Sequence, residues 1–346
     1  SLERDGPRTP GGLEPGGELS FEACTRQLLA LMDYAALREQ QSAARREGRY
    51  LGIGWASFIE QSAPNSRVYG GAGVPIAAGD GCSLRLEANG ALTCITSAQF
   101  QGQGLETGLA QLIGEAFGVP LESVRMVHGD TAVTPVGGGT WASRGLSISG
   151  EATLVAVREL KRNLVKVAAE LLEAPAADLE FSAGAVNVVG TDRAVSLAEI
   201  GFTMHYQPHR LNDSALADAM VTAHVQPTRP YQIANGVQAS LVEVDVDTGL
   251  VRLLRHWVVD DCGRIINPLL VDEQLRGGVV QGIGAALFEE CRYDDQAQLL
   301  TGTLADYLVP MAAEMPDIVI GHVETPVVGS LLGGKGVGEA SIVGAA

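Results

Sequence analysis

The stretch Cys82-Ser-Leu-Arg-Leu-Glu-Ala-Asn-Gly-Ala-Leu-Thr-Cys-Ile-Thr96 decides the fold class. Apolar and polar residues alternate on both sides of Asn89-Gly90, which is the pattern of two half-buried strands. Asn-Gly tolerates the positive φ angles of a tight turn, so the stretch predicts an antiparallel hairpin. Apolar residues at helical spacing follow from Thr107 to Phe117, after a turn at Gln103-Gly104. The order is therefore hairpin, polar loop, Gln-Gly turn and helix.

The same order recurs later in the chain. Gln238–Asp245 and Val251–Val259 read as strands that flank an Asp247-Thr248-Gly249 turn, and Gln281-Gly-Ile-Gly284 is expected to open a helix. The recurrence predicts an α+β fold with duplicated hairpin-plus-helix units in two lobes. Because the strands are linked by hairpins and do not alternate with helices, the pattern argues against a doubly wound parallel sheet.

The remaining elements lie around these two units. Local patterns predict a helix over 20–46, a strand over 50–59, a helix over 151–172, a hairpin around Ser182-Ala-Gly184, and a helix opened by Ser196 with Glu199 at capping-box spacing. We expect an N-terminal arm and helix over 1–45, a first lobe over 46–228 and a second lobe over 229–346. The Gly/Pro-rich residues 1–17 are expected to form a linker or surface arm.

Composition excludes several classes of protein. The 346 residues include 24 Lys and Arg against 41 Asp and Glu, a net charge of −17, which argues against binding a nucleic-acid backbone. The hydrophobic share of 46% is too high for a disordered chain. No apolar run is long enough to predict a membrane span. The five Cys lack C-x-x-C spacing and the His show no metal pattern, so we predict no metal-ligating residue; sparse Cys also favour a reducing, cytoplasmic location.

The run Gly329-Ser-Leu-Leu-Gly-Gly-Lys335-Gly-Val-Gly-Glu339 has two interpretations. Its glycines could present backbone N–H groups to an anionic ligand, with Lys335 adding charge and Glu339 presented at the start of a helix. It could equally be a tight turn with a solvated Lys. It nearly matches a nucleotide P-loop, but Gly336 stands where Ser or Thr would hold Mg²⁺.

Two other segments have an ordinary structural interpretation, and the first of them has a functional one as well. Gln101-Gly-Gln-Gly104 could be an ordinary strand-to-helix turn, or its amides could recognise a flat polar ring. The segment around Cys262, from Asp260 to Pro268, could be an ordinary turn with a buried thiol.

Seven runs taken together carry a family resemblance. In order, they are Gly102–Thr107, Gly139–Arg144, Val258–Pro268, Gly277–Gly284, Asp306–Pro310, His322–Pro326 and Gly334–Glu339. The chain thereby resembles the C-terminal half of the molybdopterin-binding large subunit of the xanthine dehydrogenase / aldehyde oxidase family of molybdenum hydroxylases. The resemblance covers about residues 45–346.

The resemblance implies a fold, a cofactor and a catalytic base. Family members hydroxylate an electron-poor carbon, of an N-heterocycle or an aldehyde, with oxygen derived from water. They use a molybdenum held by a pterin dithiolene, in some cases in the cytosine dinucleotide form. The Glu at the position of Glu339 acts as the general base. By the same carry-over the cofactor would be bound by Gln101, Gly102, Gln103, Ala142, Ser143, Arg144, Gly145, Cys262, Gln281, Lys335, Gly336, Val337 and Gly338.

Some features depart from the family. Gly145-Leu146 replaces two hydroxyl residues often found there, and Ala340 replaces a frequent Pro. The family's preceding half of the large subunit is not in this sequence, so we expect it on another chain or a removed segment. Iron–sulfur clusters and FAD are expected on partner subunits. Two rival interpretations stay open: an inactive, cofactor-free structural homologue or assembly module, and a P-loop-like nucleotide binder.

Overall fold

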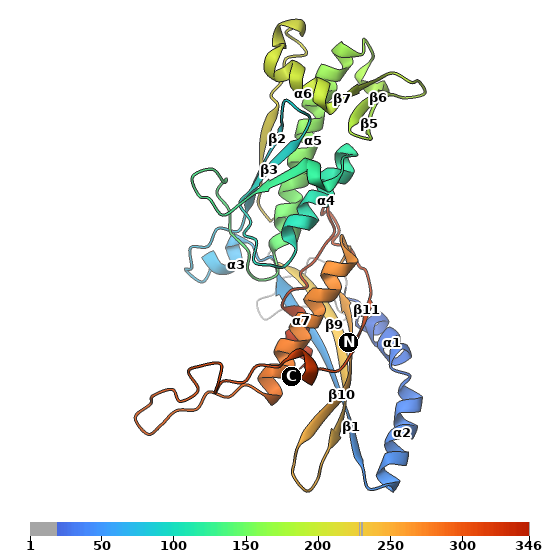
Figure 1. Ribbon diagram of the computed structural model, residues 1–346, viewed down its shortest axis with the longest axis vertical. Helices are drawn as coiled ribbons and strands as arrows, with labels where there is room; N and C mark the ends of the chain where they lie inside the picture. The colour runs from blue at the N-terminus through green and yellow to red at the C-terminus, as the bar shows by residue number, and fades with distance from the viewer. Residues whose placement is uncertain (1–18, 228, 230, 346) are drawn as a thin grey trace. The chain divides into compact units, whose positions relative to one another are not determined.

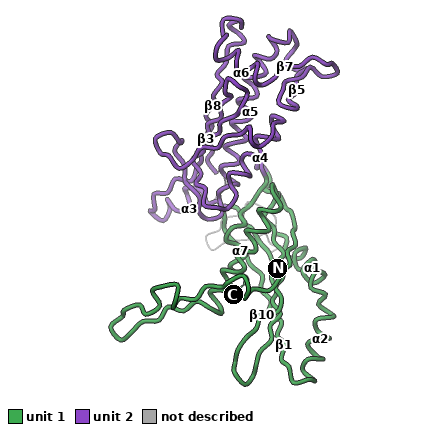
Figure 2. Tube along the Cα trace, in the orientation of Figure 1, with its two compact units in different colours: residues 1–62, 232–328, 333–346 green, residues 63–231, 329–332 purple. Residues whose placement is uncertain are grey.

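The computed structural model of the protein describes residues 19–227, 229 and 231–345. The expected arm over 1–17 therefore lies outside the described residues. The chain divides into two compact units (Figure 2). Unit 1 comprises the described residues within 1–62, 232–328 and 333–346, and unit 2 comprises those within 63–231 and 329–332.

Unit 1 is built on a four-stranded sheet of order β1-β9-β10-β11 (Figure 1). Strands β1 (Tyr50–Ser62), β9 (Gln232–Val244) and β10 (Val251–Asp261) pair antiparallel, and β11 (Ile318–His322) pairs parallel to β10. All thirteen residues of β1 pair with β9.

Helices cover both faces of this sheet. Helices α1 (Phe21–Leu31) and α2 (Tyr34–Arg46) pack on the face that carries Val237 and Val259. Helices α7 (Pro268–Leu287) and α8 (Ala340–Ala345) pack on the opposite face, where Val258 is buried. This division follows from the alternation of side chains along a strand.

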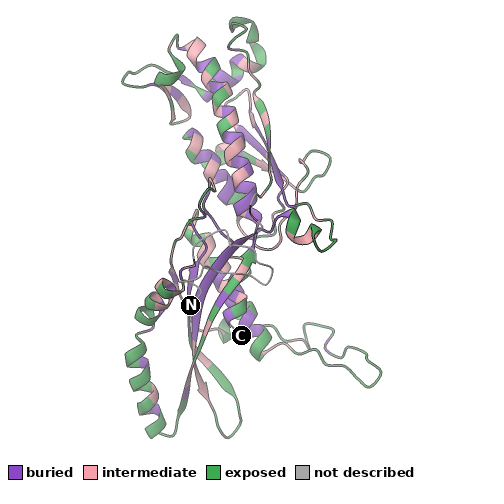
Figure 3. Ribbon diagram, turned by 180° about the vertical axis from the view of Figure 1, so that it is seen from behind, coloured by how far each residue is buried: buried purple, intermediate pink, exposed green. Residues whose placement is uncertain are grey.

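Unit 2 has a second sheet of order β4-β3-β2-β8, with β2 (Asp80–Leu86), β3 (Leu92–Thr96), β4 (Val124–Val127) and β8 (Met220–Val225). Helices α4 (Leu105–Phe117) and α5 (Gly145–Leu171) pack on it, and their apolar faces form the main core together with the sheet (Figure 3). The smaller elements are α3 (Ser66–Gly70), α6 (Leu197–Tyr206) and a sheet of β5 (Leu179–Ser182), β6 (Ala185–Val188) and β7 (Ala194–Ser196).

The two large sheets have the same connectivity. In each, an antiparallel hairpin leads through a helix to a strand that pairs parallel to the hairpin's second strand: β2-β3-α4-β4 in unit 2 and β9-β10-α7-β11 in unit 1. A further strand pairs antiparallel with the first strand of each hairpin. The predicted α+β class with duplicated units is thus confirmed. Among the described residues, no helix is long and apolar enough to cross a membrane.

Three details differ from the sequence expectations. The helix expected over 20–46 is two helices, because Asp33 adopts a left-handed conformation (φ 45°) and its carboxylate caps α2 by accepting from the Ala36 N–H. Residues 46–62, expected in the first lobe, belong to unit 1, since β1 pairs with β9 along its whole length.

The third difference concerns Gln281, which does not open a helix. Helix α7 begins at Pro268, with the Asn267 side chain accepting from the Leu270 N–H, so Gln281 lies near the end of an existing helix. Pro at the first helical position together with an Asn N-cap accounts for this earlier start.

Candidate functional site

Two glycine-rich loops of unit 2 are tied together at the starts of helices α4 and α5. The Thr140 hydroxyl donates to the Gln99 carbonyl (2.7 Å) and accepts from the Gln99 N–H (3.2 Å). The Gln101 amide reaches the Thr140 carbonyl (3.4 Å). Gln103 is used within its own loop, where its side chain accepts from the Gln101 N–H (2.7 Å) and donates to the Gln99 carbonyl (3.2 Å). The loops over 99–104 and 137–144 thus form one assembly.

The buried side chain of Arg144 holds this assembly of loops in place. Its side chain is fully buried and pairs with the equally buried Asp80 (3.0 Å). It also donates to the carbonyls of Ala78 (2.5 Å) and Gly139 (2.6 Å), and the Trp141 ring lies 5.5 Å from the guanidinium. The Arg144 side chain therefore holds the loop and is not open to a ligand.

Asp80 links Arg144 to further groups of the loops. Its carboxylate also accepts from the Ser97 hydroxyl (2.9 Å) and the Gly138 N–H (3.3 Å). Burial raises the pKa of Asp80, although Arg144 acts in the opposite direction. A Cβ on Gly137 would come within 2.0 Å of the Ser97 hydroxyl, and one on Gly138 within 2.3 Å of the Arg144 guanidinium, so close packing requires these two glycines.

The backbone of these loops suits an anion. Ala142 and Ser143 both have left-handed φ angles (47° and 49°), and the right-handed Arg144 follows immediately. Such an alternation makes a concavity of N–H groups, and here it leads into the 27-residue helix α5, whose first-turn N–H groups lack helical acceptors. Gly102 and Gly139 are also left-handed, with open space where a Cβ would be, so a ligand could approach their backbone closely.

Unit 1 has a buried ion pair of its own, between Lys335 and Asp261. The Lys335 amine lies 3.2 Å from the Asp261 carboxylate, and both side chains are fully buried. The amine also donates to the Thr325 hydroxyl (2.7 Å), and Asp261 accepts from the hydroxyls of Ser20 (2.6 Å) and Thr325. The expectation of a solvated Lys is wrong, because this network satisfies the charge inside the unit.

The glycine loop that carries Lys335 is fixed to the end of β10. The Lys335 N–H donates to the Cys262 carbonyl (2.6 Å), the Arg264 N–H donates to the Gly333 carbonyl (3.0 Å), and the Gly336 N–H donates to the Ser62 hydroxyl (3.0 Å). A Cβ on Gly263 would come within 2.4 Å of the Gly333 carbonyl. The loop is therefore a rigid part of unit 1.

Two buried acidic groups lie beside this loop. Burial raises the pKa of the Cys262 thiol well above its usual value, and the carboxyls of Asp260 and Asp261 add to the effect. The Asp260 side chain is completely buried, and neither carboxyl oxygen has a hydrogen-bond partner within the described residues. Burial, with Asp261 and Glu60 nearby, raises the pKa of Asp260 well above its usual value. Burial thus disfavours the charged forms of both groups.

The remaining predicted site residues of unit 1 lie around helix α8. Glu339 is exposed and directly precedes α8, and its carbonyl accepts from the Ile342 N–H (3.2 Å). Val337 and Gly338 are partly buried. Gln281 is exposed on α7, whereas Gly278 and Gly282 of the same helix contact α8.

Comparison with known proteins identifies the family. Residues 27–316 match the model of the molybdopterin cofactor-binding domain. The chain belongs to this family. The large subunit of nicotine 6-hydroxylase from Paenarthrobacter nicotinovorans is 34% identical over 95% of the chain, and the carbon monoxide dehydrogenase large chain from Hydrogenophaga pseudoflava is 31% identical over 94%.

Solved structures share the fold of this molybdopterin-binding domain. Quinoline 2-oxidoreductase from Pseudomonas putida 86 superposes with a TM-score of 0.86, at 34% identity over 94% of the chain. The chain spans 40% of each of the two curated relatives and 41% of that solved structure. The resemblance to molybdenum-binding large subunits is thus confirmed.

The donors present in the molybdopterin-binding domain fit such a cofactor. A pterin with a phosphorylated tail needs hydrogen-bond donors for anionic oxygens, and the left-handed backbone at 142–143 with the α5 N-terminus supplies them. The open glycines at 102 and 139 leave room for a flat ring system to approach the backbone.

Sequence reasoning missed the partners of the two buried cations. Asp80 and Asp261 are far in sequence from Arg144 and Lys335, and no local pattern links them. One signal was available: Asp260-Asp261 directly follows a strand of apolar residues, and a charged pair at that place needs a nearby partner. Sequence reasoning also missed that the side chains of Ser240, His256 and Gln238 hydrogen-bond to one another across two strands, since each residue alone is ordinary in a strand.

Proposed function

We propose that this chain is the molybdenum-cofactor-binding part of an oxidoreductase that hydroxylates an electron-poor carbon with oxygen derived from water. The observation that carries the proposal is the match of residues 27–316 to the cofactor-binding domain, together with braced, donor-rich glycine loops. Two relatives are named for nicotine and quinoline, which are N-heterocycles. An N-heterocycle is therefore the substrate class we favour, with an aldehyde second.

Backbone groups would hold the cofactor. The N–H groups of Ala142, Ser143 and Gly145 would bind its anionic oxygens, and Gly102 would let the pterin approach closely. The amides of Gln101 and Gln103 would offer donors and acceptors to the ring edges. Arg144 and Lys335 would act indirectly, because their charges are paired with Asp80 and Asp261.

The other predicted contacts come from unit 1. Gly336, Val337 and Gly338 would present backbone from the rigid loop before Glu339, and Cys262 would support that loop as a neutral thiol. Gln281 would reach the cofactor from the exposed side of α7. When bound, the molybdenum would supply two-electron redox chemistry. We extend the proposal to the cytosine dinucleotide form of the cofactor.

Glu339 would serve as the general base. Its carboxylate can hold the proton released when the oxygen of water joins the substrate carbon. The residue is exposed in this chain, so the walls that exclude water from it would come from the rest of the large subunit. We propose that half, together with iron–sulfur and flavin subunits, as the partners of a cytoplasmic complex.

Replacement of Glu339 by Gln in the assembled complex tests the base. The amide keeps the size of the side chain but cannot take up a proton, so turnover should fall by at least about 10²-fold. Molybdenum content should stay at the level of the unaltered complex, because the cofactor contacts are untouched. Retained turnover would refute the assignment of Glu339.

An inactive structural or assembly module is the second candidate. The exposure of Glu339 and the departure at Gly145-Leu146 favour it. A complete complex without molybdenum and without pterin absorbance would establish this alternative. Nucleotide binding at 329–335 has less support: residues 329–332 belong to unit 2 and Lys335 to unit 1, and the Lys335 amine is already paired.

A further inference from the structure

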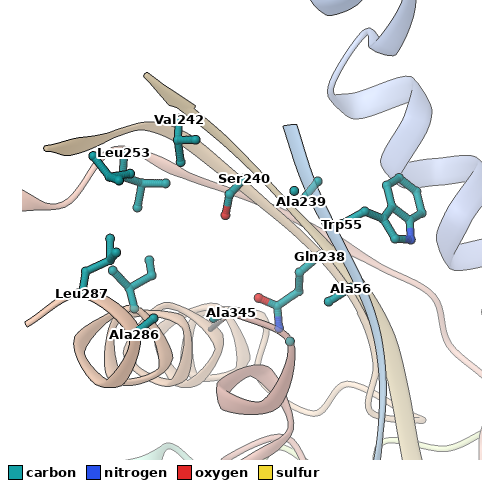
Figure 4. A pocket seen from close by; sticks show the side chains of 14 residues that line it. Trp55, Ala56, Gln238, Ala239, Ser240, Val242, Leu253, Ala286, Leu287 and Ala345 are labelled. Atoms are coloured by element: carbon teal, nitrogen blue, oxygen red, sulfur yellow. The ribbon is translucent and has the colours of Figure 1, made fainter. Parts of the chain in front are cut away.

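A chain of buried polar side chains crosses the sheet face beneath helix α8. The Ser240 hydroxyl lies 2.8 Å from His256 Nδ1, His256 Nε2 lies 2.8 Å from Gln238 Oε1, and Gln238 Nε2 lies 2.7 Å from the Ser341 carbonyl. Gln238 is 0% exposed and His256 1%. Figure 4 shows the Gln238 side chain extending from β9 toward the helix that carries Ala345.

The direction of every hydrogen bond in this chain is determined. The Ser341 carbonyl can only accept, so the amide nitrogen of Gln238 must donate to it and the amide oxygen must face His256. His256 Nε2 then carries the proton, and Nδ1 accepts from Ser240. Burial lowers the pKa of His256 to about 4, so the ring is neutral, as this arrangement requires.

Helix α8 is held equally tightly from its other side. A Cβ on Gly278 would lie 2.0 Å from the Ser341 hydroxyl, and one on Gly282 would lie 2.6 Å from the Ile342 carbonyl. Helix α8 has six residues, too few to be stable alone, so these contacts determine its position.

We infer that Gln238, oriented by His256 and Ser240, is a positioning residue for Glu339: it holds the first turn of α8 in place and thereby sets where the carboxylate projects. The inference rests on the proposed function. The physical reason is that burying a polar amide costs free energy. If this position of β9 served only for packing, an apolar side chain would be expected there. A cavity of about 210 Å³ beside Gln238 is lined mostly by apolar side chains, among them Leu253 and Ile283.

The test is Gln238→Met in the assembled holoenzyme, because Met keeps the length of the side chain and removes the donor. We expect kcat to fall about 10-fold or more with KM within about twofold and molybdenum content unchanged. Independently of activity, amide hydrogen exchange of residues 342–345 should become about 10-fold faster, while exchange in the centre of β9 is unchanged.

Val237→Ala is the matched control. Val237 is the preceding residue of the same strand, but it faces α1, so this change should lower thermal stability and leave kcat and the exchange of α8 unaltered. His256→Phe is the second variant; it keeps the aromatic volume and removes the donor that orients the amide, and should shift both readouts in the same direction as Gln238→Met.

Unchanged α8 exchange in Gln238→Met and His256→Phe would overturn the inference. Faster exchange with an unaltered kcat would overturn it too, provided that Glu339→Gln abolishes turnover in parallel. If Glu339→Gln itself stays active, the proposed base is wrong. Because that result comes from a different variant, failure of the proposed function can be distinguished from failure of the positioning role of Gln238.

Discussion

Each unit keeps one cationic side chain in a buried ion pair, Arg144 with Asp80 and Lys335 with Asp261. Removing one partner of such a pair leaves a buried charge without compensation. We predict that Asp80→Asn lowers the free energy of unfolding of unit 2 by roughly 3–5 kcal/mol. Urea unfolding followed through tryptophan fluorescence would measure it; Trp141, beside Arg144, reports on unit 2, and Trp55 and Trp257 report on unit 1.

Glu159→Gln is the control for this prediction. Glu159 pairs with Arg162 on the exposed side of α5 in the same unit, with side chains 45% and 66% exposed. Its loss should leave the unfolding midpoint almost unchanged, because exposed pairs contribute little. Equal effects of the two substitutions would contradict the bracing role of Asp80.

Asp260 makes stability depend on pH. Because burial raises its pKa, the native state retains a proton that the unfolded chain has already lost above pH ~4. Stability should therefore fall as pH rises through the raised pKa, by at most about 1.4 kcal/mol per pH unit. Asn does not titrate, so the free energy of unfolding of the Asp260→Asn variant should not fall with pH in this way. Measured from pH 5 to 9, the free energy of unfolding of the variant should therefore rise relative to that of the unaltered chain. A pH-independent difference would refute this.

At the scale of elements, two neighbouring glycines of α7 differ in what an added methyl group would contact. A Cβ on Gly278 would lie 2.0 Å from the Ser341 hydroxyl, whereas a Cβ on Gly277 meets nothing within 4 Å. We predict that Gly278→Ala destabilises unit 1 and loosens α8, and that Gly277→Ala stabilises it by about 0.5–1 kcal/mol through helix propensity. Thermal unfolding of the two variants should shift in opposite directions.

A turn, a helix cap and the glycines of α7 show where sequence reasoning succeeds and where it fails. The hairpin at Asn89-Gly90 and the cap of α6 at Ser196 were predictable, because turn and cap chemistry act between near neighbours. The start of α7 was missed because Gln281-Gly-Ile-Gly284 resembles a turn signal, whereas Gly282 within it serves contact with α8, an element far along the chain. Likewise, the candidate loops could be found from the sequence, but the buried ion pairs that hold them could not, because the paired residues are far apart along the chain.

At the scale of the whole molecule, the long segment between α7 and β11 carries many exposed apolar side chains. Over 288–316 they are Tyr293, Leu299, Leu300, Leu304, Leu308, Val309 and Met311. Exposed apolar side chains gathered on one segment are typical of an interaction site. The chain spans about 40% of its curated relatives, so the proposed remainder of the large subunit is the partner we expect to cover this segment.

Limited chymotrypsin digestion tests that expectation. In the isolated chain, cleavage should occur after Leu304 and Leu308, which are 78% and 55% exposed, and also after Leu216, which is 48% exposed in unit 2. In the assembled complex, the first two sites should be protected because burial against a partner removes them from the protease. Leu216 lies outside the segment and reports whether the protease remains active. Equal cleavage at Leu304 with and without the partner would show that the segment stays uncovered and that its apolar side chains serve another purpose.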